Sequence, residues 1–165
     1  MTGSEDDSRF HEPVLSDEIV RWMAPSGSGL YLDGTVGGGG HASLLLAASP
    51  HCRVIAVDRD PEALEVAESA LAFAKGRVRF VQARFDEAWG ELDETQPLDG
   101  ALLDLGVSSH QLDTERRGFS FRPGVDLDMR MGGAEEGIPG AAQLLNEATE
   151  EDLNLIFREY GEEPR

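Results

Sequence analysis

The chain has 165 residues, 40% of them hydrophobic, so it fits one ordinary domain whose core needs no disulfide. Its only cysteine, Cys52, excludes an internal disulfide, a Cys/His zinc box and a thiol redox pair, and we expect no metal site. The formal charge of −18 argues against a self-sufficient nucleic-acid binder, and the lack of a long apolar stretch or a signal-like start predicts a cytoplasmic protein without membrane contact.

The first part of the chain alternates between helical and strand patterns. Residues 1–9 are polar and acidic, and we expect them to form a disordered tail. Apolar residues near helical spacing then predict a short helix within residues 13–23, with Ser16 as its cap. The next expected elements form one βαβ unit: a strand over 30–33, a helix over 41–48 and a strand over 53–57.

The same alternation continues to residue 104. The Asp60-Pro61 pair starts a helix whose buried face is predicted to consist of Ala63, Leu64, Ala67, Ala70 and Leu71. A strand over 78–82, a helical stretch over 87–92 and a strand over 98–104 follow. The last of these is apolar on both faces, as a central parallel strand should be. Strands alternating with helices predict an α/β fold with a doubly wound, mostly parallel sheet.

Past Gly106 the pattern stops being repetitive. Residues 107–133 have no clear period, and long segments of this kind are usually functional or disordered. Helices are expected over 141–145 and 149–160, and Thr149 and Asp152 have the spacing of a capping box at the start of the second.

A run of four glycines, Gly37 to Gly40, indicates a site for a nucleotide cofactor. Glycines let backbone amides approach a ligand closely, and the helix that follows offers unpaired N–H groups. Asp58, at the end of the next strand, is placed to hold ribose hydroxyls. The spacing satisfies the dinucleotide fingerprint as well as a methyltransferase loop, so S-adenosylmethionine and NAD both remain open. A glycine-rich turn without a ligand is the third alternative.

Three more side chains fall where open parallel sheets bind ligands, near the carboxyl ends of strands. Asp33 suits a cationic ligand and would repel a pyrophosphate, and its alternative use is in an Asx-type turn at the strand end. His41 lies at a helix start, so we expect it to be neutral and to contact the cofactor. Phe85 follows the third strand and either packs against an adenine or belongs to the core.

Asp104 ends the fourth predicted strand, and Ser108 and Ser109 follow it across a flexible glycine. A carboxylate and two hydroxyls at this place would meet a target amine beside a methyl donor. The alternative is a turn that only closes the strand.

Arginines and aromatics are interleaved in the segment without period. Aromatic side chains stack on bases and arginines meet phosphates, so the pattern is typical of an RNA-contacting loop. Acidic neighbours make salt-bridged arginines and two core phenylalanines an equal alternative. The residues concerned are Arg116, Arg117, Phe119, Phe121, Arg122 and Arg130.

With these residues placed, the chain resembles the bacterial small-subunit (16S) ribosomal RNA cytosine-N4 methyltransferases. The motifs that carry the resemblance are HEPV (11–14), DGTVGGGGH (33–41), AVDRDP (56–61), LLDLGVSSHQL (102–112), RGFSF (117–121), LDMRM (127–131) and YGEE (160–163). The resemblance implies a Rossmann-like class I methyltransferase fold, S-adenosyl-L-methionine as methyl donor, and transfer to N4 of a cytidine in the ribosomal decoding centre.

The resemblance also implies roles for particular residues. Asp104 or the Ser108-Ser109 turn would accept a hydrogen bond from the amine, while alignment with the sulfonium supplies most of the rate. Asp33 and Gly37 are also assigned to the expected cofactor site, on the basis of the sequence pattern and not of the resemblance. The cofactor contacts carried over from the family are Gly39, Gly40, His41, Asp58, Phe85, Asp104 and Gln111.

The family's chains continue for roughly as many residues again, so the resemblance implies an N-terminal half. The expected organisation is a tail over 1–9, a cofactor-binding domain over 10–131, and the start of a helical insert for substrate recognition over 132–165. The expected partners are the small ribosomal subunit and either a second copy or a complementing C-terminal half. A non-catalytic remnant or interaction module that keeps the cofactor site is the alternative function.

Overall fold

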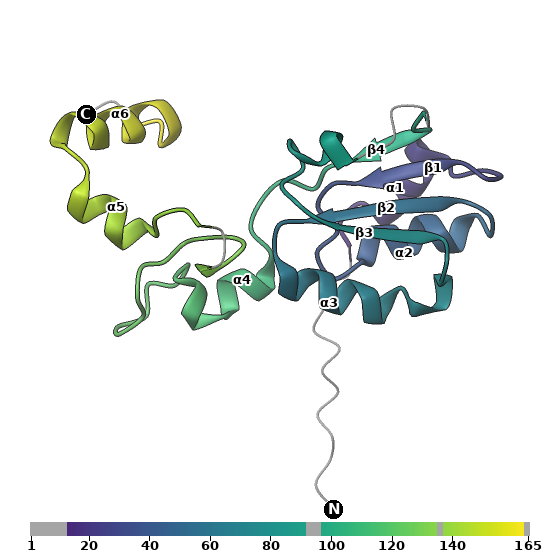
Figure 1. Cartoon of the computed structure of the whole chain (residues 1–165), viewed down its shortest axis with the longest axis horizontal. Helices are drawn as coiled ribbons and strands as arrows, with labels where there is room; N and C mark the ends of the chain where they lie inside the picture. Colours follow the sequence, from purple (N-terminus) through teal and green to yellow (C-terminus); the bar gives the residue numbers. More distant parts are fainter. Residues whose placement is uncertain (1–12, 92–96, 135–136, 164–165) are drawn as a thin grey trace, which may run out of the picture. The chain divides into compact units, whose positions relative to one another are not determined.

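A computed structural model describes residues 13–91, 97–134 and 137–163 of the chain. The expected tail over 1–9 lies outside these ranges. The chain divides into two compact units, residues 1–108 and 109–165, each described here by itself (Figure 1). The boundary expected after residue 131 lies inside the second unit and stays a prediction.

The first unit is built on a sheet of four parallel strands. Their order is β3-β2-β1-β4, so the chain crosses over between neighbours as it does in an open α/β sheet. Leu32 of β1 pairs with Ile55 of β2 and with Ala101 of β4. The predicted α/β fold is confirmed. The strands are β1 (Leu30–Asp33), β2 (Arg53–Asp58), β3 (Val78–Gln82) and β4 (Gly100–Leu102).

Three helices cover one face of this sheet, and a single 3-10 turn contributes to the other (Figure 1). Alternate residues explain why both faces are buried: Tyr31 points to the helical side, and its neighbours Leu30 and Leu32 point to the opposite one. On that opposite face the strands pack against Ala88. The elements are α1 (Ser16–Met23), α2 (Gly40–Ala48), α3 (Pro61–Ala70), η1 (Ala72–Ala74) and η2 (Ala88–Glu91).

The predicted start of α1 is wrong in one detail. Leu15 is its cap residue, in the left-handed region at φ 55°, and Ser16 is already inside the helix. The Ser16 hydroxyl donates instead to the carbonyl of Pro13 (2.6 Å). The side chain therefore bridges the residues before the helix rather than capping its amides.

The predicted buried face of α3 is confirmed for Leu64, Ala67 and Leu71 but not for Ala70, which is exposed. The Asp60 carboxylate caps this helix by accepting from the Glu62 amide (3.0 Å). Leu71 is buried because α3 ends at Ala70 and the following 3-10 turn redirects the chain.

The fourth strand is shorter than the predicted 98–104, and among the described strands it lies at the sheet edge rather than in the centre. It can pair only with β1, which is four residues long, so its ladder ends at Leu102. Leu103 and Leu105 are consequently 45% and 66% exposed. The helical stretch predicted over 87–92 is the short turn η2, and residue 92 lies outside the described ranges.

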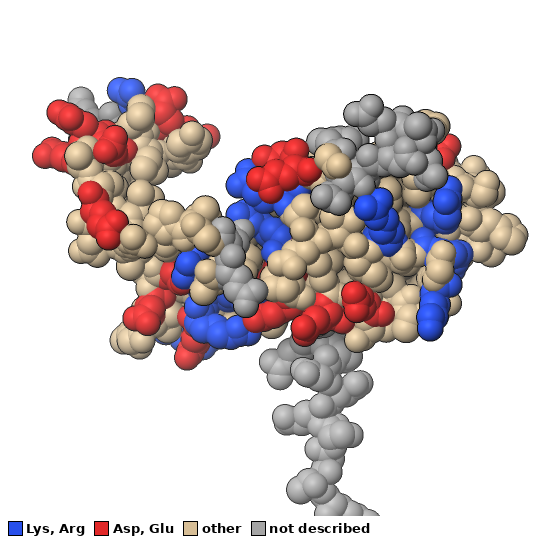
Figure 2. Space-filling model, in the orientation of Figure 1, with Lys and Arg blue, Asp and Glu red and all other residues tan. Residues whose placement is uncertain are grey.

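The second unit is helical. The two predicted helices over 141–145 and 149–160 are confirmed, and Thr149 caps the latter by accepting from the Asp152 amide (3.2 Å). Figure 2 shows acidic side chains gathered over α6, which has three acids in its first turn. The elements are α4 (Ser109–Asp113), η3 (Glu115–Arg117), α5 (Ala141–Glu147) and α6 (Glu150–Tyr160). None of the helices in the described part of the chain has the length and apolar character needed to cross a membrane.

Candidate functional site

The carboxyl ends of the strands bring three predicted carboxylates to one edge of the first unit. Asp33 is the last residue of β1, Asp58 is the last residue of β2, and Asp104 follows β4 by two residues. The loops are tied together: the Gly34 amide donates to the Leu102 carbonyl (2.9 Å). This is the edge at which open α/β sheets bind ligands.

In the glycine loop, residues 34–40, close packing requires glycine at some positions but not at all of them. A Cβ on Gly39, which has φ +87°, would lie 3.2 Å from Leu71 Cγ, and one on Gly40 would lie 3.3 Å from Pro13. Gly37 also has a positive φ, +52°, but a Cβ there would meet nothing within 4 Å. Close helix packing explains Gly39 and Gly40, whereas Gly37 borders open space.

Asp33 is fully buried, and its carboxylate is only half satisfied. Its Oδ1 accepts from the Thr35 amide (3.2 Å), while Oδ2 has no hydrogen-bond partner among the described residues. Burial raises the pKa of Asp33 from 3.8 to about 6, and the Thr35 hydrogen bond opposes this shift. A buried acceptor without a partner is costly in the protein alone, so this oxygen makes Asp33 a candidate functional group.

Asp58 is tied to the glycine loop by its side chain. Oδ2 accepts from the Gly37 amide (2.9 Å), and Oδ1 accepts from the Asp60 amide (2.9 Å). Burial raises the pKa of Asp58, and these two amides act against the rise. Each carboxylate oxygen has a second lone pair, so a ribose hydroxyl can still be accepted.

His41 is the second residue of α2 and is buried. Its Nε2 lies 2.9 Å from the carbonyl of Val14, and its Nδ1 lies 3.9 Å from Oδ2 of Asp104. The Asp104 carboxylate is half-exposed, and the Asp104 amide donates to the Thr35 hydroxyl (2.7 Å). The ring therefore links the segment before α1 to the loop after β4.

The other predicted site residues divide between the two units. Phe85 is partly exposed and borders the glycine loop, because a Cβ on Gly34 would lie 3.3 Å from Phe85 Cβ. Ser108 ends the first unit and is exposed. Ser109 and Gln111 belong to α4 of the second unit, where Gln111 is buried and donates to the Met131 carbonyl (3.0 Å).

Thr35 and Val14 are site residues that the sequence reasoning did not single out. Thr35 connects two loops, since its amide donates to Asp33 and its hydroxyl accepts from Asp104. The sequence feature that could have indicated Thr35 is its position between an acidic residue and the run of glycines. Val14 acts through its carbonyl, which no side-chain pattern reports. Across the described ranges, no cluster of three or more His, Cys, Asp or Glu side chains is arranged to hold a metal.

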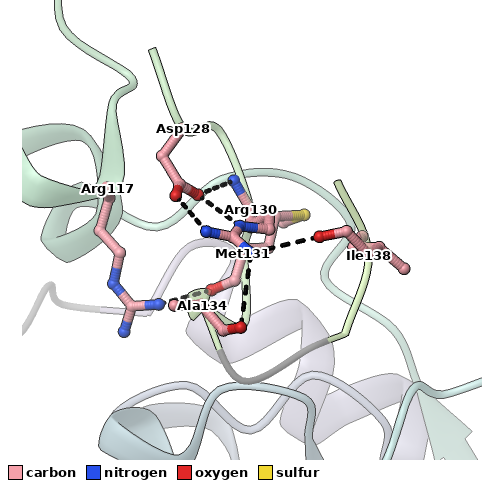
Figure 3. Close-up of polar contacts among 6 residues, drawn as sticks. All are labelled: Arg117, Asp128, Arg130, Met131, Ala134 and Ile138. Atoms are coloured by element: carbon pink, nitrogen blue, oxygen red, sulfur yellow. Dashed lines mark hydrogen bonds and ion pairs between the residues drawn. The ribbon is translucent and has the colours of Figure 1, made fainter. Parts of the chain in front are cut away.

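The arginine-rich segment of the second unit is largely an internal scaffold. Arg130 forms a two-pronged ion pair with Asp128 (2.9 and 2.6 Å) and donates to the Ile138 carbonyl (3.2 Å) (Figure 3). The Arg130 hydrogen bonds hold the pKa of Asp128 below its usual range. Arg117 is buried and donates to the Met131 carbonyl (3.2 Å) (Figure 3).

Other members of the segment remain on the surface. Arg122 pairs with Glu115 (3.1 Å), and both side chains are more than 60% exposed. Phe121 is fully exposed, so the alternative with two core phenylalanines is wrong for this residue. Arg116 and Arg122 are the exposed arginines among the four named in this segment.

Replacing Arg130 by Lys is expected to lower the free energy of unfolding by about 1–2 kcal/mol, because Lys cannot form the two-pronged pair and reach the Ile138 carbonyl together. The matched control is Arg122→Lys, in an exposed pair worth only about 0–1 kcal/mol. Urea unfolding of both variants measures the difference. Equal losses would show that the Arg130 contacts do not hold the segment.

The sheet order, the crossovers and the glycine loop define a Rossmann-like nucleotide-binding class of α/β protein. The chain belongs to the MraW methylase family, whose family model matches residues 8–165. It is 49% identical over 157 residues to ribosomal RNA small subunit methyltransferase H of Geobacter sulfurreducens, covering 93% of this chain and 50% of that protein.

A second relative with the same name, from Anaeromyxobacter dehalogenans, is 50% identical over 157 residues, covering 93% of this chain and 49% of the relative. The chain thus spans about half the length of the curated relatives it matches. Among solved structures, a putative rRNA methylase from Clostridium thermocellum superposes with a TM-score of 0.48 at 17% identity, over 58% of this chain and 55% of that one.

Proposed function

We propose that the chain is the cofactor-binding half of an S-adenosylmethionine-dependent methyltransferase that modifies the N4 amine of a cytidine in small-subunit ribosomal RNA, in the decoding centre. The observation that carries the proposal is the buried Oδ2 of Asp33, which lacks a partner among the described residues at the end of β1, the strand that leads into the glycine loop. The relatives named as ribosomal RNA small subunit methyltransferases support the same substrate class.

The donor set fits S-adenosylmethionine better than NAD. A buried carboxylate at the end of β1 stabilises a cationic group and repels a pyrophosphate, which disfavours the dinucleotide. Asp58 would take the ribose hydroxyls, and Phe85 at the border of the glycine loop would lie against the adenine. When bound, S-adenosylmethionine supplies a methyl group made electrophilic by the sulfonium charge.

The remaining task of the protein is to align the target amine. The N4 amine of cytosine is a weak nucleophile because its lone pair is delocalised into the ring, so orientation would supply most of the rate. Asp104 would accept a hydrogen bond from this amine, with Ser108 and Ser109 as the further candidate acceptors. Gln111, whose side-chain amide donates to the Met131 carbonyl, stays a predicted cofactor contact.

Asp104→Ala is expected to lower methyl transfer to small ribosomal subunits by about 100-fold, because an acceptor that orients the amine is lost. The exposed Asp86→Ala serves as the control, since Asp86 pairs only with Arg84 in the described contacts. Tritium transfer from labelled S-adenosylmethionine measures the rate, and calorimetric titration with S-adenosylmethionine and NAD measures the ligand preference.

Full activity of Asp104→Ala with unchanged cofactor affinity would reject the role of Asp104. Cofactor binding without any transfer by the wild-type chain would favour the non-catalytic module, a reading supported by the acidic surface of α6 and the charge of −18. The cytoplasmic location and the assembly with a second copy or a complementing half remain predictions; exposed Leu103 and Leu105 beside β4 support the latter.

A further inference from the structure

We propose that the end of the sheet opposite the candidate site binds the phosphate backbone of RNA. This end is formed where β2 and β3 begin, whereas the candidate site lies where the strands finish. The inference goes beyond the proposed function, because it adds a second surface that contacts RNA without touching the cofactor. We call this surface the basic edge, and its cations are Arg53, Lys75, Arg77 and Arg79.

Charge is distributed unevenly over the first unit. Residues 34–57 and 69–85 contain no Asp or Glu, although the whole chain has a formal charge of −18. The basic edge lies within these two stretches, and Figure 2 shows Lys and Arg side chains along the right-hand end of the unit, where β2 and β3 begin in Figure 1. A local positive potential of this kind can attract a polyanion to a protein whose net charge is negative.

Hydrogen bonds hold the loops of the basic edge together. Nη1 of Arg77 donates to three carbonyls at the end of α2 and in the loop that follows it (3.1, 3.1 and 3.4 Å). The Val54 amide in turn donates to the Arg77 carbonyl (2.8 Å). The two loops are therefore fixed to each other before any ligand binds, which lowers the entropy cost of binding. The three carbonyls belong to Leu46, Ser49 and Cys52.

The cations on this framework are available to a ligand. Arg53 and Lys75 are exposed, and neither forms an ion pair with a described residue. Arg79 is paired in register with Ile55, two residues after Arg53, so both arginines lie on the same face of the sheet. Like charges beside each other on one face are unfavourable, and the phosphates of a nucleic acid would relieve the repulsion.

An aromatic side chain beside the cations favours RNA over a membrane surface. Phe73, two residues before Lys75, is 59% exposed. An exposed ring can stack on a base while neighbouring cations meet the phosphates. A lipid surface would instead require an amphipathic helix of several turns, and Phe73 lies in η1, which has only three residues. A Cβ on Gly76 would meet nothing within 4 Å, so the ligand has room beside Lys75.

The double variant Arg53→Gln with Lys75→Gln tests the basic edge, because it removes two charges from exposed side chains. The matched control is Arg21→Gln with Arg158→Gln, which removes the same charge from exposed arginines elsewhere. Arg53→Lys with Lys75→Arg retains both charges. Melting temperatures confirm that each variant is folded. Fluorescence anisotropy with a labelled single-stranded RNA oligonucleotide then measures the affinity of the 165-residue chain at several salt concentrations.

We expect the Gln double variant to bind the oligonucleotide about tenfold more weakly at low salt. The slope of log affinity against log salt should also become shallower by about 1.4, since each lost phosphate contact accounts for about 0.7. The charge-retaining variant and the control should keep the affinity and slope of wild type. The affinity for S-adenosylhomocysteine should be unchanged in all variants, because the basic edge is at the other end of the strands.

A Gln double variant that matches wild type in affinity and slope would overturn the basic edge, as would an equal loss in the control. A wild-type chain that does not bind the oligonucleotide would overturn it too. So would binding to phosphatidylserine vesicles that the Gln variant loses while its RNA affinity is unchanged. None of these results touches the proposed cofactor site, whereas failure to bind S-adenosylhomocysteine would overturn the proposed function and leave the basic edge standing.

Discussion

Replacing Asp33 by Asn is expected to stabilise the chain without ligand while weakening its affinity for S-adenosylhomocysteine. The carboxylate is fully buried and Oδ2 has no hydrogen-bond partner among the described residues, so its ionised form is poorly compensated. A neutral amide removes that cost and can keep the acceptor for the Thr35 amide. A cationic group of the ligand would at the same time lose its counter-charge.

The effect of this substitution on the free energy of unfolding depends on pH. Burial raises the pKa of Asp33 from 3.8 to about 6, so the folded chain keeps a proton that the unfolded chain releases between those values. Folding stability is therefore lost as the pH rises toward about 6, and the loss is complete above it. Asn has no such dependence, so the variant should match the stability of wild type near pH 4 and exceed it by about 3 kcal/mol above pH 7.

Urea unfolding at several pH values measures the first effect, and calorimetric titration with S-adenosylhomocysteine measures the second, expected as a tenfold or greater loss. Asp17→Asn is the control, because Asp17 is exposed in the first turn of α1. If Asp33→Asn were less stable than wild type above pH 7, or bound the ligand equally well, Asp33 would be a structural turn residue and not a ligand group.

Gly39→Ala is expected to destabilise the fold by about 2–4 kcal/mol. Gly39 has φ +87°, where L residues are strained, and its Cβ would lie 3.2 Å from Leu71 Cγ and 3.4 Å from Ala67 Cα. Both neighbours are buried in the core, so they cannot move aside cheaply.

Gly37→Ala is the matched comparison two residues earlier. Gly37 has φ +52° and open space around its Cβ position, so the variant should lose only about 1–2 kcal/mol. If the cofactor occupies that space, the same methyl group should lower affinity for S-adenosylhomocysteine. Chemical unfolding and ligand titration of both variants separate packing from binding. A Gly37→Ala variant that binds normally would show that the ligand does not approach this glycine.

Periodic patterns predicted the architecture because they report local preference and burial together. Apolar strands such as Arg53–Asp58 are buried on both faces, which is why the parallel sheet could be inferred. The gathering of Asp33 and Asp58 followed from the same reasoning, since parallel strands place their carboxyl ends at one edge.

Features that depend on a distant backbone group could not be predicted in this way. The end of β4 is set by the length of its partner β1, and the orientation of His41 is set by a carbonyl 27 residues earlier in the chain. The charge of Arg130 suggested an RNA contact, but its geometric match to Asp128 and to nearby carbonyls uses the side chain internally. Side-chain type alone does not distinguish these uses.

The proposed function requires a nucleoside cofactor to bind at the carboxyl ends of β1 and β2. A crystal structure of the chain with S-adenosylhomocysteine tests this most directly. The ribose hydroxyls are predicted to lie within hydrogen-bond distance of Asp58, with the adenine beside Phe85 and the amino acid part toward Asp33. Density for the nucleoside at any other place on the chain would contradict the account.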